Sequence, residues 1–296
     1  MRLNLHSLQL FVAVVEAGSI AAAAEREFIA ASALSKRIAE LERLLDTPLL
    51  LRQARGVEPT AAGRVLVRGA RTLLYQADDL EVQVRDFAMG ETGHVRISAN
   101  LSSITQFLAT DLRDFTQTHP RITLDLNERT SSMVTRMVLE NAADIGVFTA
   151  SIDEPRLEVH PYREDEIVLV MHKSHLLATR GQLSFIDTLE YEHIGMQQDS
   201  ATTTAAQRVV IAAGRELRIR FFVHSYDALI SMARQRFGIG LMPKGAFPLY
   251  DSTELATVRL NDAWARRRLK IGVRRGETLS AAGRMLLDHL LSSGFR

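Results

Sequence analysis

The stretch AGSIAAAAEREFIAASALSKRIAELERLL, residues 17–45, decides the fold of the first part of this 296-residue chain. Gly18 is a typical helix terminator, and the apolar residues before it recur at helical spacing, which predicts a helix over residues 3–17. Ser19 is a good N-cap for a short second helix over residues 20–26. The apolar residues of a third helix form one stripe: Leu34, Ile38, Leu41 and Leu45. Two helices that meet across a tight turn predict a helix-turn-helix.

The third helix leaves free the face opposite its apolar stripe. This face carries small and basic side chains: Ala31, Ser32, Ser35, Lys36 and Arg37. Serine hydroxyls can hydrogen-bond base edges or phosphates, and basic side chains can neutralise phosphate, so the face suits a DNA groove. An ordinary solvated helix face is the alternative interpretation, and these residues alone favour it.

A wing-like segment follows the third helix. Residues 48–51 are apolar and strand-like, and residues 52–59 form a turn-rich loop that carries Arg52 and Arg55. A basic loop beside a recognition helix can grip the flanking DNA backbone. Arginines on a loop are more often simply solvated, so only the position of this loop favours the DNA contact.

Thr60 then caps a helix of unusual length, over residues 61–88. Its apolar residues alternate in steps of four and three: Leu66, Ala70, Leu73, Ala77, Leu80, Val84 and Phe87. This is an a/d heptad seam on a helix of about 42 Å, too long to be buried by the small unit before it. The seam predicts pairing with a second subunit, and packing within one chain is the alternative.

Residues 8–63 resemble the winged helix-turn-helix of the LysR-type bacterial transcriptional regulators. The residues that carry the resemblance are Phe11, Glu16, Gly18, Ser19, Ala23, Ala24, Ala33, Leu34, Ser35, Ile38, Leu41, Glu42, Leu49, Arg52, Thr60, Ala62 and Gly63. The resemblance implies a DNA-binding domain over residues 1–60, a linker and dimerisation helix over 61–90, and an effector-binding domain over 91–296 similar to the bacterial periplasmic binding proteins. The candidate DNA contacts are Ser19, Ala31, Ser32, Ser35, Lys36, Arg37, Arg52 and Arg55.

The resemblance also implies partners. These are double-stranded operator DNA, a second copy of the chain bound through residues 61–88 and usually assembled further into a tetramer, a small-molecule effector, and RNA polymerase if the protein is an activator. The chain departs from the family pattern at Ala31, Asp46 and Leu50, where the family commonly has glutamine, glycine and phenylalanine. Because Ala31 cannot make a bidentate contact to adenine, base readout there is apolar or absent, and an operator sequence does not transfer from relatives.

From residue 94 onward, strand-like and helical patterns alternate, which predicts parallel α/β sheet in two lobes. The predicted strands cover residues 94–99, 122–127, 143–148, 167–171, 219–223, 239–242 and 269–274. The predicted helices cover residues 104–118, 133–141, 201–213 and 228–236, with a last helix from Ser280. The resemblance implies crossovers near residues 160–163 and 266–269, so that lobe one covers about 91–161 and 267–296 and lobe two about 162–266. A ligand then belongs in the cleft between the lobes.

Several polar residues are candidates for the effector site. Ser103 with Gln106 predicts a capping box, and Ser102 just before it places a hydroxyl at a helix N-terminus, which favours an anion. The resemblance places the serine pair, residues 130–132 and residues 199–204 at the cleft rim. The candidate effector contacts are Ser102, Ser103, Ser131, Phe148, Asp199, Thr202 and Thr203. Helix capping is the alternative role for the polar residues, and core packing for Phe148. The set weakly favours a polar or carboxylate-bearing effector.

Composition excludes several other classes of protein. The chain has no cysteine, a formal net charge of +1 and no long apolar run, which favours a cytoplasmic protein without membrane contact. We expect no cofactor, no metal and no enzymatic activity, because no nucleophile with a base and no metal triad stands out. Arg266, Arg267 and Arg268 form a basic cluster whose default interpretation is a solvated crossover segment, with contact to a partner or to DNA as the alternative. The alternative function is a regulator without an effector, whose C-terminal domain serves only assembly.

Overall fold

A computed structural model describes residues 3–53, 56–89, 93–149, 154–276 and 279–294, which form two compact units. The first unit holds Met1–Thr92 with Glu140–Ala142, and the second holds Gly93–Leu139 with Ala143–Arg296. Among the described residues, no helix is long and apolar enough to cross a bilayer.

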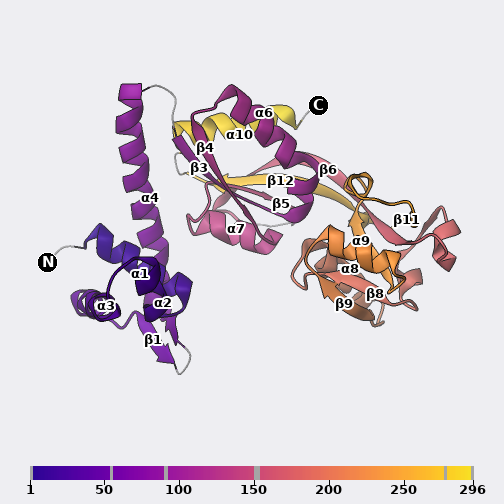
Figure 1. The fold of residues 1–296 in the computed structure, drawn as a ribbon, viewed down its shortest axis with the longest axis horizontal. Helices are drawn as coiled ribbons and strands as arrows, with labels where there is room; N and C mark the ends of the chain where they lie inside the picture. The colour runs from indigo at the N-terminus through magenta and orange to yellow at the C-terminus, as the bar shows by residue number, and fades with distance from the viewer. Residues whose placement is uncertain (1–2, 54–55, 90–92, 150–153, 277–278, 295–296) are drawn as a thin grey trace. The chain divides into compact units, whose positions relative to one another are not determined.

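The first unit contains a helix-turn-helix and a wing, as predicted (Figure 1). Its elements are α1 (Leu5–Ala17), α2 (Ile20–Arg26), α3 (Ala31–Leu45), β1 (Leu50–Gln53), β2 (Gly56–Pro59) and α4 (Ala61–Met89). The strands β1 and β2 pair antiparallel as a two-stranded wing. Leu10, Phe11, Leu34 and Leu49 are almost completely buried in one core, which holds α1, α2 and α3 together.

Two glycines allow the wing to pack closely against the helices. Gly18 ends α1 with a φ of 61°, and its carbonyl accepts a hydrogen bond of 2.8 Å from the backbone N–H of Val57 in the wing. A Cβ atom on Gly63 would lie 2.1 Å from the carbonyl oxygen of Leu49, so only glycine fits where α4 passes the start of the wing. Ser19 caps α2 as predicted, accepting a hydrogen bond from Ala22.

The predicted seam along α4 divides into two parts. Ala70 is buried, and it packs with Leu66 against Leu8 and Val12 of α1 within the same chain. Leu73 and Leu80 are 46% and 61% exposed. The side chains of Val84 and Phe87 lie outside the description. The first part of the seam therefore serves the chain's own core, which the sequence pattern alone could not separate from the rest.

The second unit is a mixed α/β domain with two lobes on one continuous sheet, ordered β4-β3-β5-β12-β6-β10-β8-β9, with β11 paired to β6 and β7 paired to β11. Its strands are β3 (Gly93–Ala99), β4 (Ile122–Glu128), β5 (Ile145–Phe148), β6 (Leu157–His172), β7 (Gln182–Leu183), β8 (His193–Met196), β9 (Ile219–Val223), β10 (Ile239–Pro243), β11 (Leu255–Leu260) and β12 (Arg266–Arg274). Its longer helices are α6 (Ala109–Thr118), α7 (Ser131–Leu139), α8 (Ala201–Ala212), α9 (Tyr226–Arg234) and α10 (Ala281–Ser293).

Helices cover both faces of each lobe. In lobe one, α6 and α10 pack on one face of the sheet and α7 on the other (Figure 1). In lobe two, α8 and α9 bury their apolar residues in separate cores on the two faces. The core of lobe one includes Tyr162 and Leu269, whereas the core of lobe two includes Ile167 and Ala265. The change from one core to the other therefore falls within a few residues on both β6 and β12.

The predicted parallel pairing holds within each lobe, but the strands that join the lobes make the sheet mixed. The strands β3, β4 and β5 are parallel in lobe one, as are β8, β9 and β10 in lobe two. The long strands β6 and β12 instead run antiparallel to each other, and β12 is antiparallel to β5 and β6 to β10. A parallel pair needs a helical crossover, whereas these two strands carry the chain directly from one lobe to the other and back.

The charged run of β6 explains why this strand is longer than its apolar segment at residues 167–171. Across the ladder, Arg266, Arg267 and Arg268 pair in register with Glu166, Asp165 and Glu164. Opposite charges on facing positions stabilise such a pair of strands. The interpretation of the three arginines as a solvated segment is therefore wrong for Arg267, whose side chain is 9% exposed.

Candidate DNA-reading face and effector cleft

The structure exposes the face of α3 that the sequence analysis selected. Ala31, Ser32, Lys36 and Arg37 are exposed and Ser35 is half-buried, while Leu34 on the other face is buried. Among the described residues, no carboxylate pairs with Lys36 or Arg37. Two free cations beside small side chains leave this helix able to approach a phosphate backbone closely.

The other DNA candidates differ in position. Ser19 caps α2, and its hydroxyl already accepts a hydrogen bond from the backbone N–H of Ala22. Arg52 lies on β1, with its side chain outside the description, and Arg55 lies outside the described residues. The helix α3 begins after Ala30, which makes no side-chain cap. The first backbone N–H groups of α3 therefore keep their hydrogen-bonding capacity.

In the second unit, a cleft of about 300 Å³ opens between the two lobes. The candidates Ser102, Ser131, Asp199 and Thr202 line it. Ser102 and Ser131 belong to lobe one, whereas in lobe two Asp199 lies just before α8 and Thr202 in its first turn. Four of the seven predicted contacts thus meet around one cavity, although about 70 to 100 residues separate the two groups in the sequence.

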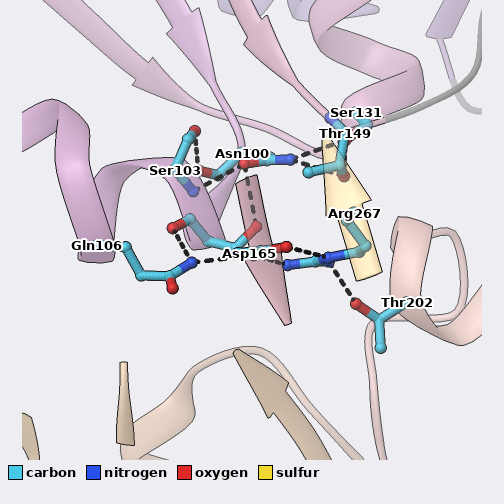
Figure 2. A network of polar contacts seen from close by, with 9 residues as sticks. Asn100, Ser103, Gln106, Ser131, Thr149, Asp165, Thr202 and Arg267 are labelled. Carbon is cyan, nitrogen blue, oxygen red and sulfur yellow. Dashed lines mark hydrogen bonds and ion pairs between the residues drawn. The ribbon is translucent and has the colours of Figure 1, made fainter. Parts of the chain in front are cut away.

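Asn100 organises the lobe-one wall of the cleft (Figure 2). Its Nδ2 donates to Ser131 Oγ at 2.9 Å and to Thr149 Oγ1 at 3.1 Å. Its Oδ1 accepts from the backbone N–H of Ser103 at 2.9 Å and from Ser102 Oγ at 3.3 Å. One buried amide therefore holds three hydroxyl side chains in fixed positions at the cleft.

This arrangement corrects the capping prediction. The helix begins at Leu101 with Asn100 as its N-cap, and the predicted Ser103 and Gln106 capping box does not form. Gln106 instead lies in a π-helical turn, Ile104–Leu108, and donates to the carbonyl of Ser102 and to Asp165 Oδ2, both at 3.0 Å. Asparagine caps helices as well as serine does, so the helix start could have been predicted from Asn100.

Three predicted effector contacts do not line the cleft. Ser103 is completely buried and donates to the carbonyl of Asn100. Phe148 is completely buried and packs against Gly272, and the next residue, Thr149, lines the cleft instead. Thr203 is buried and donates to the carbonyl of Met196, which leaves it a capping role.

The cleft also contains a buried ion pair that the sequence analysis missed. Figure 2 shows Arg267 of β12 turned toward Asp165 of β6 and toward Thr202 of α8. Arg267 Nε donates to Asp165 Oδ1 at 2.8 Å, and Arg267 Nη1 donates to Thr202 Oγ1 at 2.9 Å. The side chain of Asp165 is only 1% exposed. Both crossover strands and both lobes therefore meet in one polar network.

Tyr226 adds a polar group from lobe two. It is buried, and it lines the cleft at the start of α9. Burial raises the pKa of Tyr226 above its ordinary value, so the phenol keeps its proton at neutral pH and can donate a hydrogen bond.

A winged helix-turn-helix, together with a two-lobed domain whose lobes enclose a polar cleft, defines a ligand-responsive transcriptional regulator. Comparison with known proteins agrees. The profile of the bacterial regulatory helix-turn-helix proteins of the lysR family matches residues 5–64, and that of the LysR substrate binding domain matches residues 88–294. The chain belongs to the LysR family of transcriptional regulators and is a DNA-binding regulator with an effector-binding domain.

Individual relatives cover most of the chain. It is 28% identical over 245 residues to the probable HTH-type transcriptional regulator LrrA of Synechococcus elongatus, covering 82% of this chain and 81% of LrrA. The crystal structure of full-length CbnR complexed with its target DNA matches 98% of this chain and all of that one, at a TM-score of 0.68 and 21% identity. The effector binding domain of QuiR in complex with shikimate matches 69% of this chain and 98% of that one, at a TM-score of 0.61 and 18% identity.

Proposed function

We propose that this regulator binds operator DNA through the exposed face of α3 and the wing, as a dimer joined along α4 and assembled further into a tetramer. A small polar effector binds in the cleft between the lobes and changes the affinity or geometry of DNA binding. The proposed domains are the reading head over residues 1–60, the linker helix over 61–90 and the effector domain over 91–296. The likeness to CbnR bound to its target DNA and to QuiR bound to shikimate supports this reading.

One observation carries the effector proposal. Hydroxyl groups from lobe one, held by Asn100, face Thr202 and Arg267 across a cavity of about 300 Å³, which is the size of a small-metabolite site. A domain that served assembly alone would not need a buried asparagine and a buried ion pair to position side chains around a cavity.

The chemistry of the cleft favours an effector that carries a carboxylate and further polar groups. The protonated Tyr226 supplies a hydroxyl donor and the Ser102 hydroxyl an acceptor, while Arg267 presents a guanidinium group that is already paired with Asp165. Acidic side chains of Glu128 and Asp199 line the same cleft, so an effector with an additional donor group fits better than a bare anion. RNA polymerase becomes a further partner if the protein activates transcription.

A thermal-shift screen of the full chain tests this proposal. We expect a saturable rise in melting temperature with an organic acid, an aromatic acid or an amino acid, because a ligand that binds only the folded state stabilises it. The rise should vanish in Ser102→Ala and persist in the control Ser231→Ala, whose side chain is exposed on α9.

If Ser102→Ala leaves ligand binding unaffected, the effector binds outside the cleft. A broad screen without any ligand would favour the alternative function, a regulator whose C-terminal domain serves only assembly.

A further inference from the structure

A second and larger hollow adjoins the effector cleft on the side of the crossover strands. It has a volume of about 1220 Å³. It shares a wall with the cleft at Ser131, Thr149, Asp199, Ala201 and Arg267. Arginine and lysine dominate its lining: six cationic side chains stand against four acidic ones. The effector proposal does not use this basic groove.

Three of the four acids of the basic groove have cationic partners, Asp165 through its pair with Arg267, whereas Asp199 accepts only from Thr130 Oγ1 in the described part of the chain. Glu166 Oε1 accepts from Arg259 at 2.8 Å, and Glu166 Oε2 lies 3.5 Å from Lys244 Nζ. Arg259 lowers the pKa of Glu166 below its ordinary value, so this carboxylate is ionised and occupied. Glu164 accepts from Arg268 at 3.2 Å.

Three cations of the groove have no such partner in the described part of the chain. They are Arg208 on α8, and Arg266 and Lys270 on β12. Arg266 faces Glu166 in the β6–β12 register, but that carboxylate is engaged by Arg259 and Lys244. Unpaired cations from two different elements in one concave site focus a positive field on it.

We propose that the basic groove is a second anion-binding site, which takes a small molecule carrying two or more phosphate or carboxylate groups. The cations on α8 and on β12 can each bind a separate anionic group. A ligand with a single carboxylate could pair with only one of the two elements. A duplex DNA backbone fits less well, because the carboxylate of Glu164 is 76% exposed and would repel a continuous row of phosphates. This site goes beyond the proposed function, since Arg208, Arg266 and Lys270 do not line the effector pocket.

The test uses the full chain and tripolyphosphate as the probe, in a calorimetric titration at constant ionic strength. The triple variant Arg208→Gln, Arg266→Gln, Lys270→Gln should weaken binding by about tenfold for each removed cation. The control Arg180→Gln, Arg215→Gln, Arg218→Gln removes the same charge from exposed positions of lobe two outside the groove and should leave the affinity unchanged. Orthophosphate should bind at least about tenfold more weakly than tripolyphosphate.

Two further variants separate this site from the others. Ser102→Ala changes only the effector cleft, and Lys36→Gln with Arg37→Gln changes only the reading helix, so both should keep tripolyphosphate affinity. If both triple variants lost the same affinity for tripolyphosphate, the loss would come from net charge alone, and the proposal would be overturned. A loss in Ser102→Ala or in the α3 variant, with none in the groove variant, would also overturn it. If the triple variant fails to fold, Arg208→Gln alone should weaken tripolyphosphate binding about tenfold. Arg208 is exposed on α8, so its substitution does not disturb the core.

Discussion

Arg267 Nη1 donates a hydrogen bond of 2.9 Å to Thr202 Oγ1 while the rest of its guanidinium group pairs with Asp165. The two strands that join the lobes thus carry a charge pair inside the protein, and α8 of lobe two contacts it directly. Gln106 of lobe one donates to the same carboxylate at 3.0 Å. Because two buried charges are costly unless each is fully hydrogen-bonded, this network defines one arrangement of the lobes.

The first prediction concerns the stability of this ion pair. Arg267→Gln leaves the carboxylate of Asp165 buried without its cation, and should lower the free energy of unfolding by about 3 to 5 kcal/mol. Adding Asp165→Asn should recover most of that loss, because the amide needs no counter-charge. Denaturant unfolding at pH 7 measures both values.

The next pair along the same ladder is a matched control. Arg268 and Glu164 lie 3.2 Å apart, but their side chains are 77% and 76% exposed. Arg268→Gln should therefore change stability by less than about 1 kcal/mol. A loss as large as that of Arg267→Gln would show that the ladder register, rather than burial, sets the cost.

The sequence predicted the reading head better than the cleft, for a physical reason. Helix stripes and caps are local patterns, so Gly18, Ser19 and the exposed face of α3 could be identified from short stretches. The partners of Asp165 are Arg267 of β12, 102 residues further along, and Gln106, 59 residues earlier. A charged run gives no local sign of a cross-strand partner, which is why β6 was predicted too short and Arg267 was taken as solvated.

The second prediction concerns the reading helix. Lys36→Gln and Arg37→Gln should each weaken binding to operator and to unrelated duplex DNA alike, and each should lower the slope of log affinity against log salt by about one. A fluorescence anisotropy titration at several salt concentrations measures both quantities.

Arg68→Gln is the control for this prediction, because Arg68 is exposed on α4 and has no carboxylate partner in the described part of the chain. Its affinity for DNA should stay unchanged. Unchanged affinity in Lys36→Gln and Arg37→Gln would remove the face of α3 from the DNA interface.

The third prediction concerns α4. Leu73 and Leu80 are exposed apolar residues on one stripe of a 29-residue helix, whereas Ala70 is buried against α1. Leu73→Lys with Leu80→Lys should therefore break subunit pairing without unfolding the reading head, since charged residues on an a/d seam are costly only where two helices meet. Sedimentation velocity at micromolar concentration distinguishes the outcomes. A surviving dimer would place the subunit interface elsewhere.

The last prediction concerns acid stability through His193. This imidazole is buried in lobe two, where Nδ1–H donates to the carbonyl of Tyr191 at 3.0 Å, and burial lowers its pKa from 6.5 to about 4. Protons therefore bind the unfolded chain more tightly than the folded one. The stabilisation is complete above pH 6.5 and is lost as the pH falls toward 4, by roughly 3 kcal/mol in total.

Unfolding free energies of the native chain should accordingly fall between pH 7 and pH 4, and His193→Gln should flatten that part of the profile at the cost of lower stability at pH 7. His94→Gln is the control, because His94 is exposed on β3 and its removal should leave the slope intact. A profile that stays equally steep in His193→Gln would assign the acid sensitivity to other groups, since only a proton taken up at residue 193 on unfolding is lost in that variant.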